Sequence, residues 1–191
     1  MRCCRNPKLH RWWALWLGVA IWVAVAASNH AHIRSAEMVL RDEMWTLDAD
    51  LDVQLGSALE EALNKGVTLT FLFEFQITRP MKYWFDDEVL TKRRQTTLSY
   101  HALTRQYLLQ IDQHQKALDT LSDVKHELGQ VRDWRMGPHA LLEKNQSYRA
   151  ALKMHLDRSK LPKALQVDAI GEDSWELVTP TFSWWVKESV R

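Results

Sequence analysis

Apolar side chains fall on every second position between residues 67 and 78, and polar side chains fill most of the positions between them. This two-residue period is that of a β-strand with one buried face. Burying each such side chain contributes about 1.5–3 kcal/mol, so we expect this strand to lie at the centre of the core. The apolar residues of the set are Val67, Leu69, Phe71, Phe73, Phe75 and Ile77.

A second alternating stretch covers residues 45–55, where Asp48, Asp50 and Asp52 occupy the polar positions. The pattern predicts a half-buried antiparallel strand with an acidic outer face. Solvated strand carboxylates are favoured over a calcium loop of the EF-hand type, because that loop needs a glycine where Val53 stands and a glutamate where Leu59 stands.

Other segments carry weaker strand patterns. The tail is a closing strand or a short helix, and residues 131–136 fit neither period clearly. The remaining predicted strands are residues 33–40, with a turn at 41–43 after them, residues 90–111 as two strands joined near 102–104, residues 148–156, residues 165–169 and, in the tail, residues 182–186.

Two short helices are predicted. Ser57 and Glu60 have the spacing of a capping box, and Gly66 supplies the left-handed residue that ends the first helix. Residues 118–128 have apolar side chains at helical spacing before Gly129. Helices of this length need to dock on other elements to be stable. We therefore expect a mainly β, α+β fold: an antiparallel sheet or sandwich with two covering helices, in a single domain at residues 28–191.

Residues 1–27 have the pattern of an export signal. They contain four basic residues, no acidic residue, and an apolar run of about 16 residues, shorter than the roughly 20 that span a bilayer comfortably. We expect cleavage after Ala26 or Ala27, and the alternative is an uncleaved N-terminal membrane anchor. In both cases the segment inserts in the inner membrane during export, and the rest is extracytoplasmic. Cys3 and Cys4 lie in this segment, so the exported part contains no disulfide.

Charge and glycine placement exclude several classes of protein. The chain has a formal charge of +1, and the part after the leader has a charge of −3, which does not suit binding to nucleic acid. The six glycines are too scattered for a dinucleotide or phosphate loop, and there is no nucleophile elbow. We expect a protein that is not an enzyme and that holds no cofactor or metal.

One group of polar residues within a predicted hairpin is a candidate site. Arg93, Arg94, His101 and Arg105, beside Tyr100 and Tyr107, form an anion-binding cleft or a partner contact in this hypothesis, with arginine as the bidentate donor. In the alternative interpretation the aromatic rings belong to the core and the cations are solvated. The basic run at residues 92–94 would then protect an exposed sheet edge from pairing.

Several runs, in this order along the chain, resemble the bacterial family catalogued as domain of unknown function 4390. The resemblance implies an exported, periplasmic protein of unassigned activity, often encoded beside a sensor histidine kinase, and it implies no catalytic residue. The runs are residues 62–71, Tyr83-Trp84, residues 98–107, residues 156–162 and Gln166-Val167.

Two functions follow from these observations as hypotheses. The first is a non-enzymatic binding or accessory domain that acts near the inner membrane, with a membrane protein such as a sensor kinase as its partner. The alternative is a carrier of a small hydrophobic ligand or lipid, with a cavity lined by tryptophans. These tryptophans are Trp84, Trp134, Trp175, Trp184 and Trp185.

Overall fold

Strand β3 (Leu69–Arg79) lies inside the larger of two antiparallel sheets. It pairs with β4 on one side and with β8 on the other. Its inward side chains are at most 2% exposed, from Leu69 to Ile77. The predicted central strand is therefore confirmed, and its first apolar residue, Val67, lies just before the strand and is half-buried.

The computed structural model describes residues 28–81, 86–143, 145–168 and 173–187. The predicted leader, Tyr83-Trp84 and the end of the predicted strand at residues 165–169 lie wholly or partly outside these ranges.

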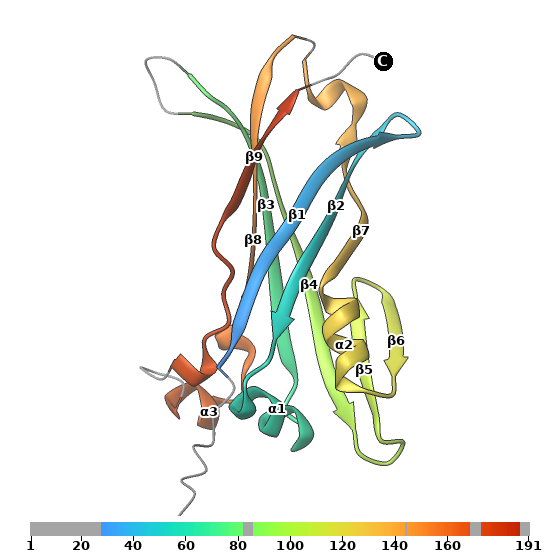
Figure 1. Ribbon diagram of the computed structural model, residues 1–191, viewed down its shortest axis with the longest axis vertical. Coiled ribbons are helices and arrows are strands. Elements are labelled where there is room, and N and C mark those ends of the chain that lie inside the picture. The colour runs from blue at the N-terminus through green and yellow to red at the C-terminus, as the bar shows by residue number, and fades with distance from the viewer. Residues whose placement is uncertain (1–27, 82–85, 144, 169–172, 188–191) are drawn as a thin grey trace, which may run out of the picture.

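The two sheets pack face to face, with the smaller sheet crossing in front of the larger one in Figure 1. The order of strands is β1-β2-β7 in the smaller sheet and β6-β5-β4-β3-β8-β9 in the larger, and every neighbouring pair is antiparallel. The mainly β sandwich is thus confirmed. The other strands are β1 (His30–Arg41), β2 (Met44–Gln54), β4 (Asp87–His101), β5 (Gln106–Ile111), β6 (His114–Leu118), β7 (Gln130–Pro138), β8 (Ser147–Leu156) and β9 (Phe182–Lys187).

The helices are short and lie at the ends and sides of the sheets. Helix α1 (Ser57–Asn64) and helix α3 (Lys163–Asp168) lie at the lower end of the molecule in Figure 1. Helix α2 (Leu121–Leu128) lies beside β5 and β6 and leads directly into β7. One continuous cluster of buried side chains, from Ala31 to Val186, fills the space between the sheets.

The start of α1 differs from the predicted capping box. Gly56 is the N-cap, and Ser57 is already the first helical residue and makes no capping hydrogen bond. The reason is a contact from the beginning of the domain, because the Asn29 Oδ1 atom accepts a hydrogen bond of 2.6 Å from the Gly56 N–H group. Glu60 pairs instead with Lys125 of α2, at 2.8 Å. The predicted end of the helix is confirmed, since Gly66 has φ +87°.

Two other local predictions were wrong. Residues 165–168 belong to helix α3 rather than to a strand, because the chain turns after Pro162, whose carbonyl accepts hydrogen bonds from the Leu165 and Gln166 N–H groups. Leu118 lies in strand β6 and not in the second helix. That helix begins later because the Thr120 side chain caps it by accepting a hydrogen bond from the Asp123 N–H group.

The ambiguous segments are both strands. Residues 131–136 belong to β7, and the tail forms β9, so the first of its two alternatives is correct.

Candidate functional site

The outer face of the smaller sheet is covered by ion pairs. Asp48 pairs with Arg41 at 2.5 Å, and Asp52 pairs with Arg34 at 2.5 Å. Asp50 pairs with Arg132 of β7. The acidic outer face predicted for residues 45–55 is therefore confirmed, and each of its three carboxylates has a guanidinium partner.

Two β-bulges bring these arginines to the outer face. The pairing of β1 with β2 shifts between Ile33 and Ser35, so Arg34 and Ser35 both line the groove over the outer face. The pairing of β2 with β7 shifts in the same way, because Leu47 faces Trp134 but Ala49 faces Val131. As a result, one extra residue lies between the two buried positions of β7.

Helix α2 lies close to this face because of Gly129. The Leu51 N–H group donates a hydrogen bond of 2.7 Å to the Gly129 carbonyl. A Cβ atom at Gly129 would stand 2.4 Å from the Leu51 carbonyl oxygen, which is shorter than any normal contact. Only glycine lets the end of the helix approach β2 so closely.

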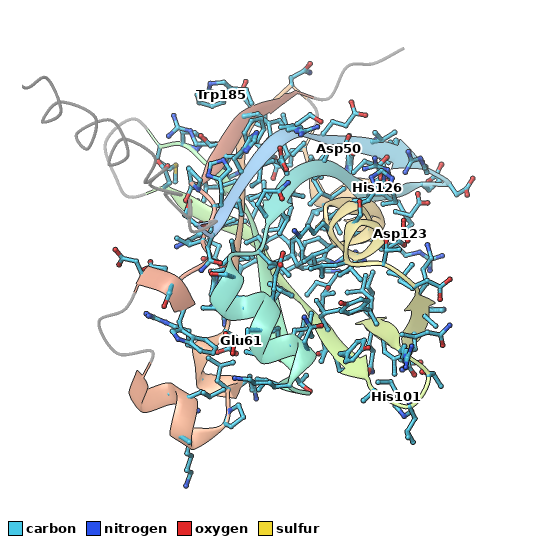
Figure 2. The ribbon with its side chains drawn as sticks, turned by 60° about the horizontal axis from the view of Figure 1, so that its bottom comes forward. Asp50, Glu61, His101, Asp123, His126 and Trp185 are labelled. Atoms are coloured by element: carbon cyan, nitrogen blue, oxygen red, sulfur yellow. The ribbon has the colours of Figure 1, made fainter. Side chains whose placement is uncertain are left out.

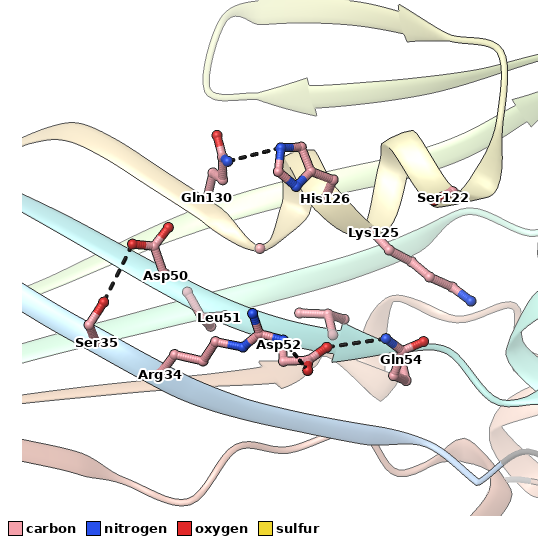
Figure 3. A pocket seen from close by; sticks show the side chains of 12 residues that line it. Arg34, Ser35, Asp50, Leu51, Asp52, Gln54, Ser122, Lys125, His126 and Gln130 are labelled. Atoms are coloured by element: carbon pink, nitrogen blue, oxygen red, sulfur yellow. Dashed lines mark hydrogen bonds and ion pairs between the residues drawn. The ribbon is translucent and has the colours of Figure 1, made fainter.

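Between α2 and the outer face of β1 and β2 lies an open groove with a volume of about 640 Å³. We call it the sheet–helix groove, and Figure 3 shows it from close by. One wall comes from the sheet and the other from the helix and the residues just after it. The sheet wall presents Arg34, Ser35, Asp50, Asp52 and Gln54, and the helix wall presents Ser122, Lys125, His126 and Gln130.

Most groove side chains hold one another in place through single contacts. Gln54 donates a hydrogen bond of 3.1 Å to Asp52, and the His126 Nε2 atom lies 3.0 Å from the Gln130 side-chain nitrogen. Ser35 lies 3.4 Å from the nearer Asp50 oxygen. The groove therefore offers donors and acceptors on both walls, arranged for recognition of polar groups.

The acidic side chains of this face are held in the charged form. The hydrogen bond from Arg41 holds the pKa of Asp48 below its usual range, and the hydrogen bond from Arg34, helped by Gln54, does the same for Asp52. Such carboxylates accept hydrogen bonds and do not donate protons near neutral pH. Within the described part of the chain, no three His, Cys, Asp or Glu side chains are grouped so as to hold a metal ion.

The four site residues proposed from the sequence do not come together. Arg93 lies on the outer face of the larger sheet and pairs with Glu74 at 2.9 Å. Arg94 points to the opposite face, as the two-residue period of a strand requires. His101 and Arg105 lie at the tip of the β4–β5 hairpin, about 23 Å from Arg94 along the extended strand. Figure 2 shows how far His101 lies from the groove.

Tyr100 and Tyr107, the aromatic residues beside these cations in the sequence, stabilise the hairpin. The rings of Tyr100 and Tyr107 lie 5.0 Å apart, and the Tyr107 hydroxyl donates a hydrogen bond of 3.1 Å to Asn64 of α1. Burial raises the pKa of Tyr107. These contacts tie the hairpin to the first helix.

Two of the tryptophans expected to line a carrier cavity share a neighbour, and the other two described ones lie elsewhere in the fold. Trp134 and Trp184 both contact the Phe75 ring, Trp175 is buried near α1, and Trp185 is 54% exposed on the outer face of β9. Trp84 lies outside the described residues. The described tryptophans therefore do not surround one common space.

Sequence reasoning did not identify the sheet–helix groove. It identified the acidic strand face and the second helix separately, but the contact between Asp50 and Gln130 joins residues 80 positions apart. The one local signal was the three-residue spacing of inward side chains, Ile33 to Ala36 and Val131 to Trp134, which marks the bulges.

Fold and surface together define an antiparallel β-sandwich with a polar groove on the outer face of its smaller sheet. The chain belongs to the family described as a domain of unknown function, DUF4390, whose model matches residues 28–185. The resemblance drawn from the sequence is thereby confirmed. No curated protein and no solved structure matches the chain. Within the described ranges, no helix is both long enough and apolar enough to cross a membrane.

Proposed function

We propose that the protein is a non-catalytic binding domain that holds a polypeptide segment of a partner protein in the sheet–helix groove. The observation that carries this proposal is the pair of polar walls, which face each other across about 640 Å³ of open space. That volume lies in the range of known binding sites, roughly 300–1,000 Å³. Because the groove is open, it suits an extended polypeptide segment that passes along it better than a small ligand that the protein encloses.

The ion pairs of the groove favour exchange with a partner. The Arg34 side chain is 62% exposed and pairs with Asp52, which is 25% exposed. Exposed pairs of this kind contribute only about 0–1 kcal/mol, so a partner's carboxylate or ammonium group replaces them at small cost. The positive and negative side chains along β1 and β2 then select a partner whose charges have the complementary order.

We place this function outside the cytoplasm and next to the inner membrane. The support is the export pattern of residues 1–27 and the fixed position of Asn29 directly after it. Asn29 donates hydrogen bonds to the Ser174 and Glu176 carbonyls, at 2.7 and 3.1 Å, besides accepting one from Gly56. If the leader is retained, the domain therefore sits within a few residues of the bilayer. The sensory part of a membrane histidine kinase is the partner class that the family resemblance suggests.

Photocrosslinking in cells that express the full chain tests the binding proposal. A photoreactive benzoylphenylalanine replaces the exposed Ser122 or Gln54 in the groove, and Gln76 on the outer face of the larger sheet serves as the control. We expect both groove positions to give the same discrete adduct with one partner protein. No adduct from the groove, or the same adduct from Gln76, would show that the groove is not the binding surface.

The N-terminus of the protein recovered from cells tests the export proposal separately. We expect an extracytoplasmic protein that begins near Ala27 or Ser28, or one that keeps Met1 and fractionates with the inner membrane. Recovery of the protein from the cytoplasm would contradict export in both forms.

A further inference from the structure

A second hollow lies between strand β7 and the β4–β5 hairpin, on the other side of Gln130 from the sheet–helix groove. It has a volume of about 640 Å³, and the residues that matter for its chemistry are Arg94, Ile111, Trp134 and Arg135. We call it the Arg94 cleft. Its walls come from both sheets, because β4 and β5 belong to the larger sheet and β7 to the smaller one.

The cleft exists because β4 is longer than its neighbour on this side. Strand β5 pairs with β4 only from Thr96 onward, so the segment of β4 before Thr96 pairs with β3 alone. The outer strand β7 of the smaller sheet stands opposite this segment. A hydrogen bond of 2.9 Å from the Lys92 Nζ atom to the Arg135 carbonyl spans the space between them.

Arg94 is held in this cleft, and its Nε–H group is left without a hydrogen bond to the part of the chain that the structure describes. The side chain is only 13% exposed, and its guanidinium lies over the Trp134 ring at 4.7 Å. Its Nε atom lies 3.3 Å from Asp112, without the geometry of a hydrogen bond, and finds no hydrogen-bond partner among the described residues. Burial lowers the pKa of Arg94, and the charge of the nearby Asp112 carboxylate partly offsets this effect.

The charges around Arg94 leave the cleft able to accept an anion. Two of its acidic side chains are engaged elsewhere: Glu127 pairs with Lys116 at 2.7 Å, and Asp133 pairs with Arg41 at 2.5 Å. Arg135 is exposed, lines the same cleft, and has no ion-pair partner in the described part of the chain. Asp112 is 57% exposed, so an incoming anion displaces it toward solvent.

We propose that the Arg94 cleft binds an organic anion, a carboxylate attached to an apolar group. The carboxylate lies against the guanidinium groups of Arg94 and Arg135, which offer paired N–H donors in the geometry that carboxylates accept. The apolar part lies against Ile111 and against the small part of Trp134 that reaches the cleft. This site is separate from the partner groove, and either assignment stands without the other.

Isothermal titration calorimetry tests the proposal on protein purified from cells that express the full chain. The probes are phenylacetate, the neutral phenylacetamide of the same shape, and inorganic phosphate. We expect phenylacetate to bind with a stoichiometry of one, and the other two probes to bind at least tenfold more weakly. Absence of phenylacetate binding at millimolar concentration, or equal binding of phenylacetamide or of inorganic phosphate, overturns the proposal.

Three variants locate the site. Arg94→Gln and Arg135→Gln each weaken phenylacetate binding by about tenfold or more, because each removes one charge-assisted contact. Arg135 is exposed, so its variant keeps the fold even if Arg94→Gln does not. The matched control is Arg93→Gln, on the opposite face of β4, which leaves binding unchanged. Unchanged binding by Arg135→Gln, or an equal loss in Arg93→Gln, contradicts the assignment.

Discussion

At the scale of single residues, two glycines act for different physical reasons. Gly66 adopts φ +87°, and a Cβ atom there meets no atom within 4 Å. Gly129 has an ordinary helical backbone, but a Cβ atom there would stand 2.4 Å from the Leu51 carbonyl oxygen. Backbone conformation requires glycine at position 66, and the lack of space between α2 and β2 requires it at position 129.

This difference predicts unequal costs of substitution by alanine. Gly66→Ala should lower the free energy of unfolding by about 1 kcal/mol, the cost of a left-handed residue with a side chain. Gly129→Ala should lower it by about 3 kcal/mol, because the backbone must move to relieve the clash. Urea unfolding of both variants measures the difference. A Gly129→Ala variant as stable as Gly66→Ala would mean that the approach of the helix to β2 is looser than described.

The pairing of Asp48 with Arg41 predicts a dependence of stability on pH. The pKa of Asp48 is lowered in the folded protein, above all by the hydrogen bond from Arg41. Its stabilising effect is therefore present above the unfolded value, about 3.9, and is lost as the pH falls through that value toward the folded pKa.

Urea unfolding at a series of pH values between about 5 and 3 checks this sign. We expect Arg41→Gln to make the decrease in unfolding free energy shallower than in the natural chain. Arg149→Gln is the control, because the Arg149 guanidinium lies over the Trp185 ring at 5.0 Å rather than against a carboxylate. If the unfolding free energy decreased equally steeply with falling pH in all three proteins, the pairing of Asp48 with Arg41 would not explain the pH dependence.

At the scale of elements, strand β3 determines the core. Phe73 is 2% exposed and Gln76 is exposed on the other face of the same strand. Phe73→Ala should cost about 3–5 kcal/mol through lost burial and a cavity, whereas Gln76→Ala should stay within about 0.5 kcal/mol. Thermal unfolding of the two variants gives the comparison. Equal melting temperatures would show that the alternation of β3 does not define a buried face.

Regular strands were predictable from the sequence, and irregular ones were not. The alternation at residues 67–78 is broken only by Leu72, so its prediction needed only the period of a strand. Residues 131–136 were ambiguous because the bulge in β7 separates the inward residues Val131 and Trp134 by three positions. The same strand period should have shown that Arg94 shares the inward face of Thr96 and Leu98, which separates it from Arg93.

At the scale of the whole molecule, long-range pairing was beyond the reach of the sequence. The two-sheet arrangement depends on β7 joining β2 across helices α1 and α2 and strands β3 to β6. No local pattern specifies that partner, because alternation fixes which face is buried but not which strand lies alongside. The sheet–helix groove and the Arg94 cleft both border β7, so neither could be assembled from the sequence.

Two matched charge exchanges test most directly whether the sheet–helix groove recognises a partner. Arg34→Asp with Asp52→Arg keeps an ion pair on the groove wall but reverses its order, and Arg93→Glu with Glu74→Arg does the same on the outer face of the larger sheet. Both variants should keep their unfolding free energy within about 1 kcal/mol. The account predicts that the exchange of Arg34 with Asp52 reduces the yield of the adduct formed by the photoreactive residue at position 122 by at least tenfold. The exchange of Arg93 with Glu74 should leave this yield unchanged. An undiminished yield after the first exchange would contradict it.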